Sequence, residues 1–87
     1  MKKTPKITED GADKIIWEHG RRNHQMRRDG FLRIAIPVRD ESNIAGILVF
    51  SKNIKETEKI MGEDPGVKAD IFVYEIHESR SFPGDAL

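Results

Sequence analysis

The chain has 87 residues, no cysteine and a formal net charge of zero. A chain of this length forms one small domain that buries roughly 60–65% of its unfolded surface, so its core is marginal on its own. The lack of cysteine excludes disulfides, cysteine-based metal sites and cysteine nucleophiles. No apolar run approaches the roughly 20 residues of a membrane-spanning helix. We therefore expect a cytoplasmic protein that does not bind membranes.

Charge is unevenly distributed along the sequence. Residues 1–39 hold ten Lys/Arg and five Asp/Glu, whereas residues 40–87 hold five and ten. This asymmetry indicates an anion-binding face or two complementary halves, although a solvated surface is the simplest interpretation. Nucleic acid is not an expected partner, because the net charge is zero and the few aromatic residues form no evident stacking platform.

A long first helix is expected to begin between Thr8 and Ala12 and to run to Asp29, with Gly30 ending it. Residues 1–8 are polar and contain a proline, which predicts an extended, partly mobile lead with no strand. Polar groups on the inward face of the helix need hydrogen-bond partners or a wet cavity. The inward stripe, in steps of three and four, is Ala12, Ile16, His19, Asn23 and Met26.

Residues 31–38 and 44–50 predict two strands joined by the polar turn 39–43. The second strand, Ile44–Phe50, has no polar residue, whereas a half-buried strand alternates apolar with polar side chains. Both of its faces therefore need cover, and the helices of so short a chain can cover only one. This predicts a homodimer or a larger assembly, in which a partner's sheet covers the second face.

The second helix has a clear start and a clear end. Asn53 and Glu56 have the spacing of a capping box, and Gly62 closes the helix. A short helical turn is expected next, with Asp64 as its N-cap and Pro65 in its first position.

The last predicted strand covers residues 71–76, and a tail without periodicity covers residues 78–87. The resulting order is helix, strand, strand, helix, strand. It corresponds to the ferredoxin-like βαββαβ unit without its first strand, in a single α+β domain. Either the last strand pairs directly with Ile44–Phe50, or a segment of another chain lies between them.

Short motifs follow one another in a distinctive order between about residues 17 and 85. They are His19 with Gly30-Phe31-Leu32 eleven residues later, Pro37 with Asp40, Gly46 near the start of an apolar strand, residues 63–69 before the last strand, and the ending made by residues 75–77 and 80–85. In this order and spacing the chain resembles the YCII-related family, whose members are small domains of the dimeric α+β barrel type.

The resemblance implies a sheet that packs against a partner's sheet and an acid–base site built on a His–Asp pair, here His19 and Asp40. A histidine titrates near pH 6.5, and a neighbouring carboxylate orients its ring and stabilises its charged form. The expected substrate-binding residues near this pair are Asn23, Arg22, Arg27 and Asp64, of which Asp64 is most simply a helix cap. No cofactor or metal is expected, because no dense acid cluster accompanies the histidines.

Three departures from the family pattern bear on function. The family's Gly-Pro is Ile36-Pro37 here, Glu78-Ser79 replaces an aromatic residue near the tail, and the apolar first strand is missing. Two functions therefore remain open. The first is a small acid–base enzyme of the lyase or isomerase type, acting on a compact organic molecule, neutral or anionic, through His19 and Asp40. The alternative is a non-catalytic ligand-binding or assembly module of the same fold.

Overall fold

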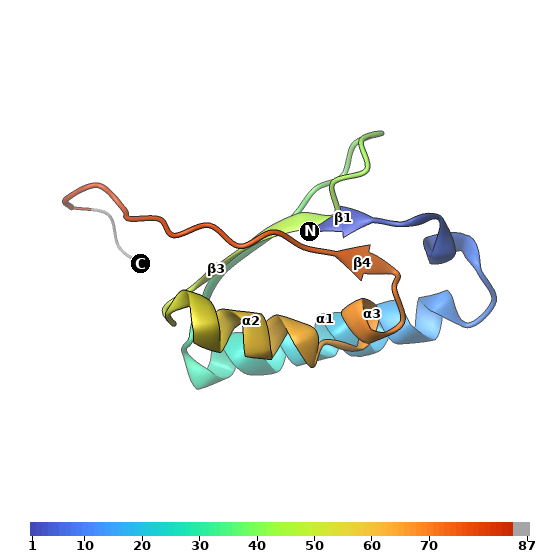
Figure 1. The fold of residues 1–87 in the computed structure, drawn as a ribbon, viewed down its shortest axis with the longest axis horizontal. Coiled ribbons are helices and arrows are strands. Elements are labelled where there is room, and N and C mark those ends of the chain that lie inside the picture. The colour runs from blue at the N-terminus through green and yellow to red at the C-terminus, as the bar shows by residue number, and fades with distance from the viewer. Residues whose placement is uncertain (85–87) are drawn as a thin grey trace.

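The computed structural model describes residues 1–84 and has two layers, with the helices packed on one side of the strands (Figure 1). The α+β class predicted from the sequence is confirmed. In chain order the elements are strand β1 (Lys2–Lys3), the 3-10 helix η1 (Pro5–Thr8), helix α1 (Ala12–Asp29), strands β2 (Leu32–Pro37) and β3 (Gly46–Phe50), helices α2 (Ile54–Gly62) and α3 (Pro65–Lys68), and strand β4 (Phe72–Val73).

Helix α1 begins and ends next to glycines in the left-handed conformation. Gly11 precedes it with φ 85° and Gly30 follows it with φ 96°. The N–H of Gly30 donates to the carbonyls of Met26 and Arg27, which satisfies two groups at the helix end. The helix buries Ala12, His19 and Met26, three of the five residues of the predicted inward stripe.

Strands β2 and β3 form an antiparallel hairpin. Ile36 lies opposite Ile47 and Ile34 lies opposite Val49. Residues that face each other across such a pair project on the same side of the sheet. Ile36 and Ile47 are 48% and 54% exposed. Leu32, which lies opposite Phe50 beyond a register shift in β2, is only 2% exposed. The hairpin therefore has a helix-covered face and an outer, apolar face.

The expectation of no strand before the first helix is wrong, because residues 2 and 3 form β1. Lys2 lies opposite Val73 of β4 on one side and bridges Ile44 on the other, both antiparallel. The N–H of Lys3 donates to the carbonyl of Asn43 at 2.6 Å. The start of the chain therefore lies between β4 and the residues that lead into β3. Backbone hydrogen bonds hold this short strand. Because its side chains do not need to be apolar, the sequence shows no apolar periodicity there.

Strand β4 is much shorter than the predicted strand 71–76, because the neighbouring β1 has only two residues. Beyond Val73 the chain runs as far as Phe82 without joining a sheet, and Pro83 and Gly84 then form a turn (Figure 1). The part of the predicted tail at 85–87 lies outside the described residues. The main core cluster sits under β1 and β4 and consists of Ala12, Ile71 and Phe72 with the partly buried Met1, Ile7, Ile15, Ile16, Ala45, Val67 and Ala69.

Candidate functional site

A buried histidine and a buried aspartate meet between α1 and α3. The Nδ1 atom of His19 lies 2.7 Å from Oδ1 of Asp64, and the two residues are 7% and 1% exposed. Asp64 is the N-cap of α3, where its Oδ2 accepts hydrogen bonds from the N–H groups of Gly66 (2.9 Å) and Val67 (3.2 Å). The Asp64 carboxylate therefore caps α3 and also binds α1 through His19.

The rest of the His19 ring is also covered by protein. Its Nε2 lies 3.3 Å from Nδ2 of Asn23, one helical turn further along α1. The ring of Phe72 lies against it, with 4.8 Å between the ring centroids. In the neutral ring with its proton on Nδ1, that nitrogen donates to Asp64 and Nε2 accepts from Asn23. Both ring nitrogens then have partners within the chain.

Arg22 extends this cluster towards α2. Its Nη2 donates to the carbonyl of Ile60 at 2.8 Å, and its Nη1 lies 3.6 Å from Oδ1 of Asp64. Within residues 1–84, Nη1 of Arg22 and Oδ1 of Asn23 are buried side-chain atoms that have no hydrogen-bond partner. The imidazole of His19 and the guanidinium of Arg22, both on α1, therefore lie beside the Asp64 carboxylate that caps α3. Arg22 also links this cluster to α2.

The expected contact between His19 and Asp40 is not formed in this chain. Asp40 is exposed in the turn between β2 and β3, where its Oδ1 accepts hydrogen bonds from the N–H and hydroxyl of Ser42. These hydrogen bonds lower the pKa of the Asp40 carboxyl. Asp64 occupies the place next to His19 that the family resemblance implied for Asp40.

The other predicted site residues divide between two places. Asn23 and Asp64 contact His19, and Arg22 lies beside Asp64. Arg27 is exposed in the last turn of α1, and its side chain forms no hydrogen bond or ion pair with residues 1–84. The role of Asp64 as a helix cap could be seen in the sequence. Its contact with His19, 45 residues away, had no local signal.

Opposing effects act on the Asp64 carboxyl. Burial raises its pKa, because a buried carboxylate loses hydration. The hydrogen bond that His19 donates, the attraction of its ring in the charged form, and the N–H groups of Val67 and Gly66 together outweigh burial and hold the pKa of Asp64 below its ordinary value. The folded chain therefore binds the Asp64 proton less tightly than the unfolded chain does.

This pKa shift predicts how stability depends on pH. Because the folded pKa is depressed, the stabilisation is complete above the unfolded pKa of about 3.9 and is lost as the pH falls through the lower folded pKa. We expect the urea unfolding midpoint of the native chain to fall below about pH 4 more steeply than that of Asp64→Asn. An identical acid dependence of the two proteins would contradict this assignment.

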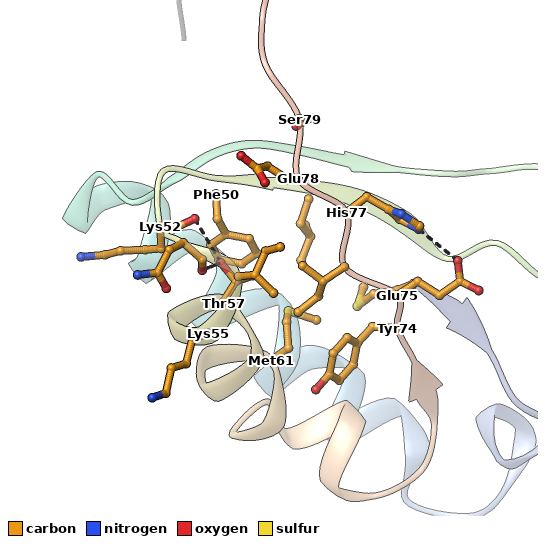
Figure 2. A pocket seen from close by; sticks show the side chains of 15 residues that line it. Phe50, Lys52, Lys55, Thr57, Met61, Tyr74, Glu75, His77, Glu78 and Ser79 are labelled. Carbon is orange, nitrogen blue, oxygen red and sulfur yellow. Dashed lines mark hydrogen bonds and ion pairs between the residues drawn. The ribbon is translucent and has the colours of Figure 1, made fainter.

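Two cavities lie elsewhere, beside β3. One of about 600 Å³ lies between α2, β3 and residues 74–79. Figure 2 shows Phe50, Thr57 and Met61 among its lining side chains, with His77 and Glu75 turned away from α2 and joined to each other. A second cavity of about 580 Å³ is lined by the outward-facing Ile47 and Val49 and by Val73 and Glu75. The lining of neither cavity includes His19 or Asp64.

Among residues 1–84, no group of three or more His, Asp or Glu side chains is placed to hold a metal ion. None of the helices there is long and apolar enough to cross a membrane.

Comparisons with protein-family models, curated proteins and solved structures find no match to this chain.

Proposed function

We propose that this protein is a ferredoxin-like binding and assembly module of the YCII-related type, which forms a homodimer or larger assembly through the outer face of its strands. The spatial order supports the ferredoxin-like part: β4 pairs with β1, Lys2 of β1 bridges Ile44, and β3 pairs with β2. These pairings, which form two two-stranded sheets joined by the single bridge from Lys2 to Ile44, are the ones that a four-strand order 4-1-3-2 with a very short first strand would contain. A cytoplasmic location is part of the proposal.

Exposed apolar side chains on the outer face carry the assembly part of the proposal. Ile36, Ile44, Ile47 and Val73 are each 39–54% exposed. All four come from the strands or their bridges, on the side opposite the helices. Apolar patches of this kind mark protein interfaces more often than free surface. A partner's sheet on this face would provide the second cover that the all-apolar run Ile44–Phe50 requires.

The His19 geometry favours binding over catalysis. A general base needs a nitrogen that can reach a substrate proton. Both nitrogens of His19 contact protein groups, the residue is 7% exposed, and neither cavity beside β3 reaches it. The open cavity of about 600 Å³ instead has the size of a small-molecule site, which supports the binding of a compact organic ligand.

Sedimentation analysis of Ile47→Glu tests the assembly. We expect the native chain to sediment at twice its mass of 10.0 kDa or more at micromolar concentration. In a two-fold interface each substitution is felt twice, so loss of two buried isoleucines should weaken association roughly a hundredfold or more. The control is Trp17→Ser, because Trp17 is 64% exposed on α1, away from the sheet. A native chain that remains monomeric would contradict the proposal.

A second candidate function is acid–base catalysis by His19 with Asp64. The observation that favours it is the 2.7 Å contact, which would orient the ring and stabilise its charged form. Catalysis would require Asn23 to leave Nε2, and Arg22 could then meet an anionic substrate. The test is incubation of a small-molecule cell extract with the native chain and with His19→Gln. A compound consumed only by the native chain, with both proteins folded by circular dichroism, would favour the enzyme.

A further inference from the structure

The outward face of α1 carries a row of cations around an exposed tryptophan. Residues that follow one another in steps of three and four share one face of a helix. Five exposed residues of α1 follow such steps, and we call them the basic stripe: Lys14, Trp17, Arg21, His24 and Arg28. The residues that the helix buries lie on the opposite side, where α1 packs against β2 and α3.

The charges of the basic stripe are not used by the fold. Within residues 1–84, the side chains of Lys14, Arg21 and Arg28 form no ion pair. Arg22 differs from them, because it turns inward and donates to the carbonyl of Ile60. Residues 19–28 hold four arginines and no acid. Because like charges at these spacings repel one another, an anion along the stripe would stabilise them.

Trp17 gives the stripe a flat aromatic surface. The residue is 64% exposed, and Cζ of Arg21 lies 5.7 Å from the centre of its ring. This distance is within the range of a cation–π interaction, which holds the ring and the guanidinium together. An aromatic ring beside an arginine is a stacking surface for a nucleic-acid base. The fold therefore provides a stacking site that the few aromatic residues of the sequence did not lead us to expect.

Other anionic partners would use only part of the stripe. A lipid surface binds a helix with an apolar face, and Trp17 is the only apolar residue here. An acidic peptide pairs with arginines but has no flat group to stack on the ring. A duplex keeps the faces of its bases stacked inside, where Trp17 does not reach them. A single strand presents both phosphates and open base faces, so it matches the charges and the ring together.

We propose that the basic stripe binds single-stranded nucleic acid, with one base stacked on Trp17 and the neighbouring phosphates held by Arg21 and Arg28. Guanidinium groups bind phosphate oxygens through two parallel hydrogen bonds. At a rise of 1.5 Å per residue, the stripe from Lys14 to Arg28 is about 21 Å long, which gives room for a short run of nucleotides.

This activity goes beyond the proposed assembly and does not depend on it. The stripe belongs to the helix layer and faces away from β2 and α3, whereas assembly uses the outer face of the strands (Figure 1). Neither cavity beside β3 is lined by a residue of the stripe. A monomer and an assembled chain would therefore present the same stripe.

Binding should weaken with salt in a predictable way. Lys14, Arg21 and Arg28 each displace counterions from about one phosphate, so the logarithm of the binding constant should fall against the logarithm of salt concentration with a slope of about −2. The Kd should therefore rise roughly twentyfold between 50 and 200 mM salt.

The fluorescence of Trp17 tests the proposal directly, because it is the only tryptophan in the chain. The probe is a short oligothymidylate, which does not pair with itself. At about 50 mM salt it should quench the fluorescence until the stripe is saturated. Arg21→Gln combined with Arg28→Gln should raise the Kd about tenfold or more and flatten the salt slope to about −0.7. The matched control is Lys55→Gln with Lys59→Gln, which removes the same charge from exposed positions of α2.

The stacking contact is tested by substitutions of Trp17 and by the anisotropy of a labelled oligothymidylate. Trp17→Leu should raise the Kd about fivefold or more, because it removes the flat ring. Trp17→Phe keeps an aromatic face and should bind more tightly than Trp17→Leu. Both positions of change are exposed, so circular dichroism should show the native fold in each variant.

The outcomes separate the possible partners. Saturable quenching that the stripe variants weaken and the α2 control does not weaken supports the proposal. Equal weakening by the α2 control overturns it, because only net charge then matters. Equal binding of a duplex or of polyglutamate also overturns it, since neither offers an open base to Trp17. A response to phosphatidylserine vesicles without one to the oligothymidylate assigns the stripe to membranes and overturns it, as does the absence of any response at about 50 mM salt.

Discussion

Replacing Asp64 with alanine is expected to lower the free energy of unfolding by about 3–5 kcal/mol, because it leaves a buried partner without its counter-charge. Asp64 is 1% exposed, contacts His19 at 2.7 Å and caps α3 through two backbone N–H groups. Its removal also leaves Nη1 of Arg22 without its nearby carboxylate. For a domain of this size, such a loss approaches the whole stability. The measurement is urea unfolding followed by circular dichroism.

Two substitutions sharpen the interpretation of that result. Asp64→Asn keeps an oxygen that can accept at the helix cap but loses the charge, so it should lie between the native chain and Asp64→Ala. Asp40→Ala should leave the unfolding midpoint almost unchanged, since Asp40 is exposed and bonds only to Ser42 in its own turn. Equal effects of the Asp64 and Asp40 substitutions would show that Asp64 does not join the helices.

Replacing Gly66 with alanine is expected to cost about 1–3 kcal/mol, the usual range for overpacking a core. A Cβ atom at this position would lie 2.8 Å from Cε2 of Phe72, closer still to its Cδ2, and 3.1 Å from Oδ2 of Asp64. Phe72 is 5% exposed and its ring rests against His19, so it cannot move without disturbing that pair. Thermal unfolding measures the loss.

An alanine at position 20 is expected to have the opposite effect on stability. Gly20 lies inside α1, and a Cβ atom there would meet nothing within 4 Å. Gly20→Ala should therefore raise the free energy of unfolding by about 0.5–1 kcal/mol through helix propensity. If both alanine variants were stabilised, Gly66 would not be required for close packing of Phe72.

Local signals in the sequence predicted the helix ends well. Gly30 ends α1, and Oδ1 of Asn53 accepts from the N–H of Glu56 at 2.8 Å at the start of α2. Asp64 and Pro65 begin α3 as expected. Each of these features depends on atoms within four residues of one another, so the responsible residue types can be read directly from the chain.

Features set by distant residues were not predictable in the same way. The inward position of His19 was predicted from helix periodicity, but its partner was not, because 45 residues separate it from Asp64. Asp40 and Asp64 each follow a plausible structural element, and only the folded chain decides between them. Likewise β1 is held by backbone bonds to Asn43 and by pairing with Val73, which leave no mark on its own side chains.

The last strand is shorter than predicted because most of its residues have no neighbouring strand to pair with. Residues 71–76 have strand-like composition, yet only Phe72 and Val73 are in a strand, next to the two residues of β1. A strand needs a partner for its backbone groups, and residues 74–79 have none within the described chain.

In the proposed binding module, His19 is a buried structural residue that reagents in solution do not reach. Carbethoxylation by diethylpyrocarbonate at neutral pH, followed by peptide mass spectrometry, tests it directly. The exposed His24 and His77 are internal controls. We expect both controls to react in the folded protein while His19 reacts only after unfolding in urea. Reaction of His19 in the folded protein as fast as that of His24 would contradict the claim and favour the acid–base enzyme.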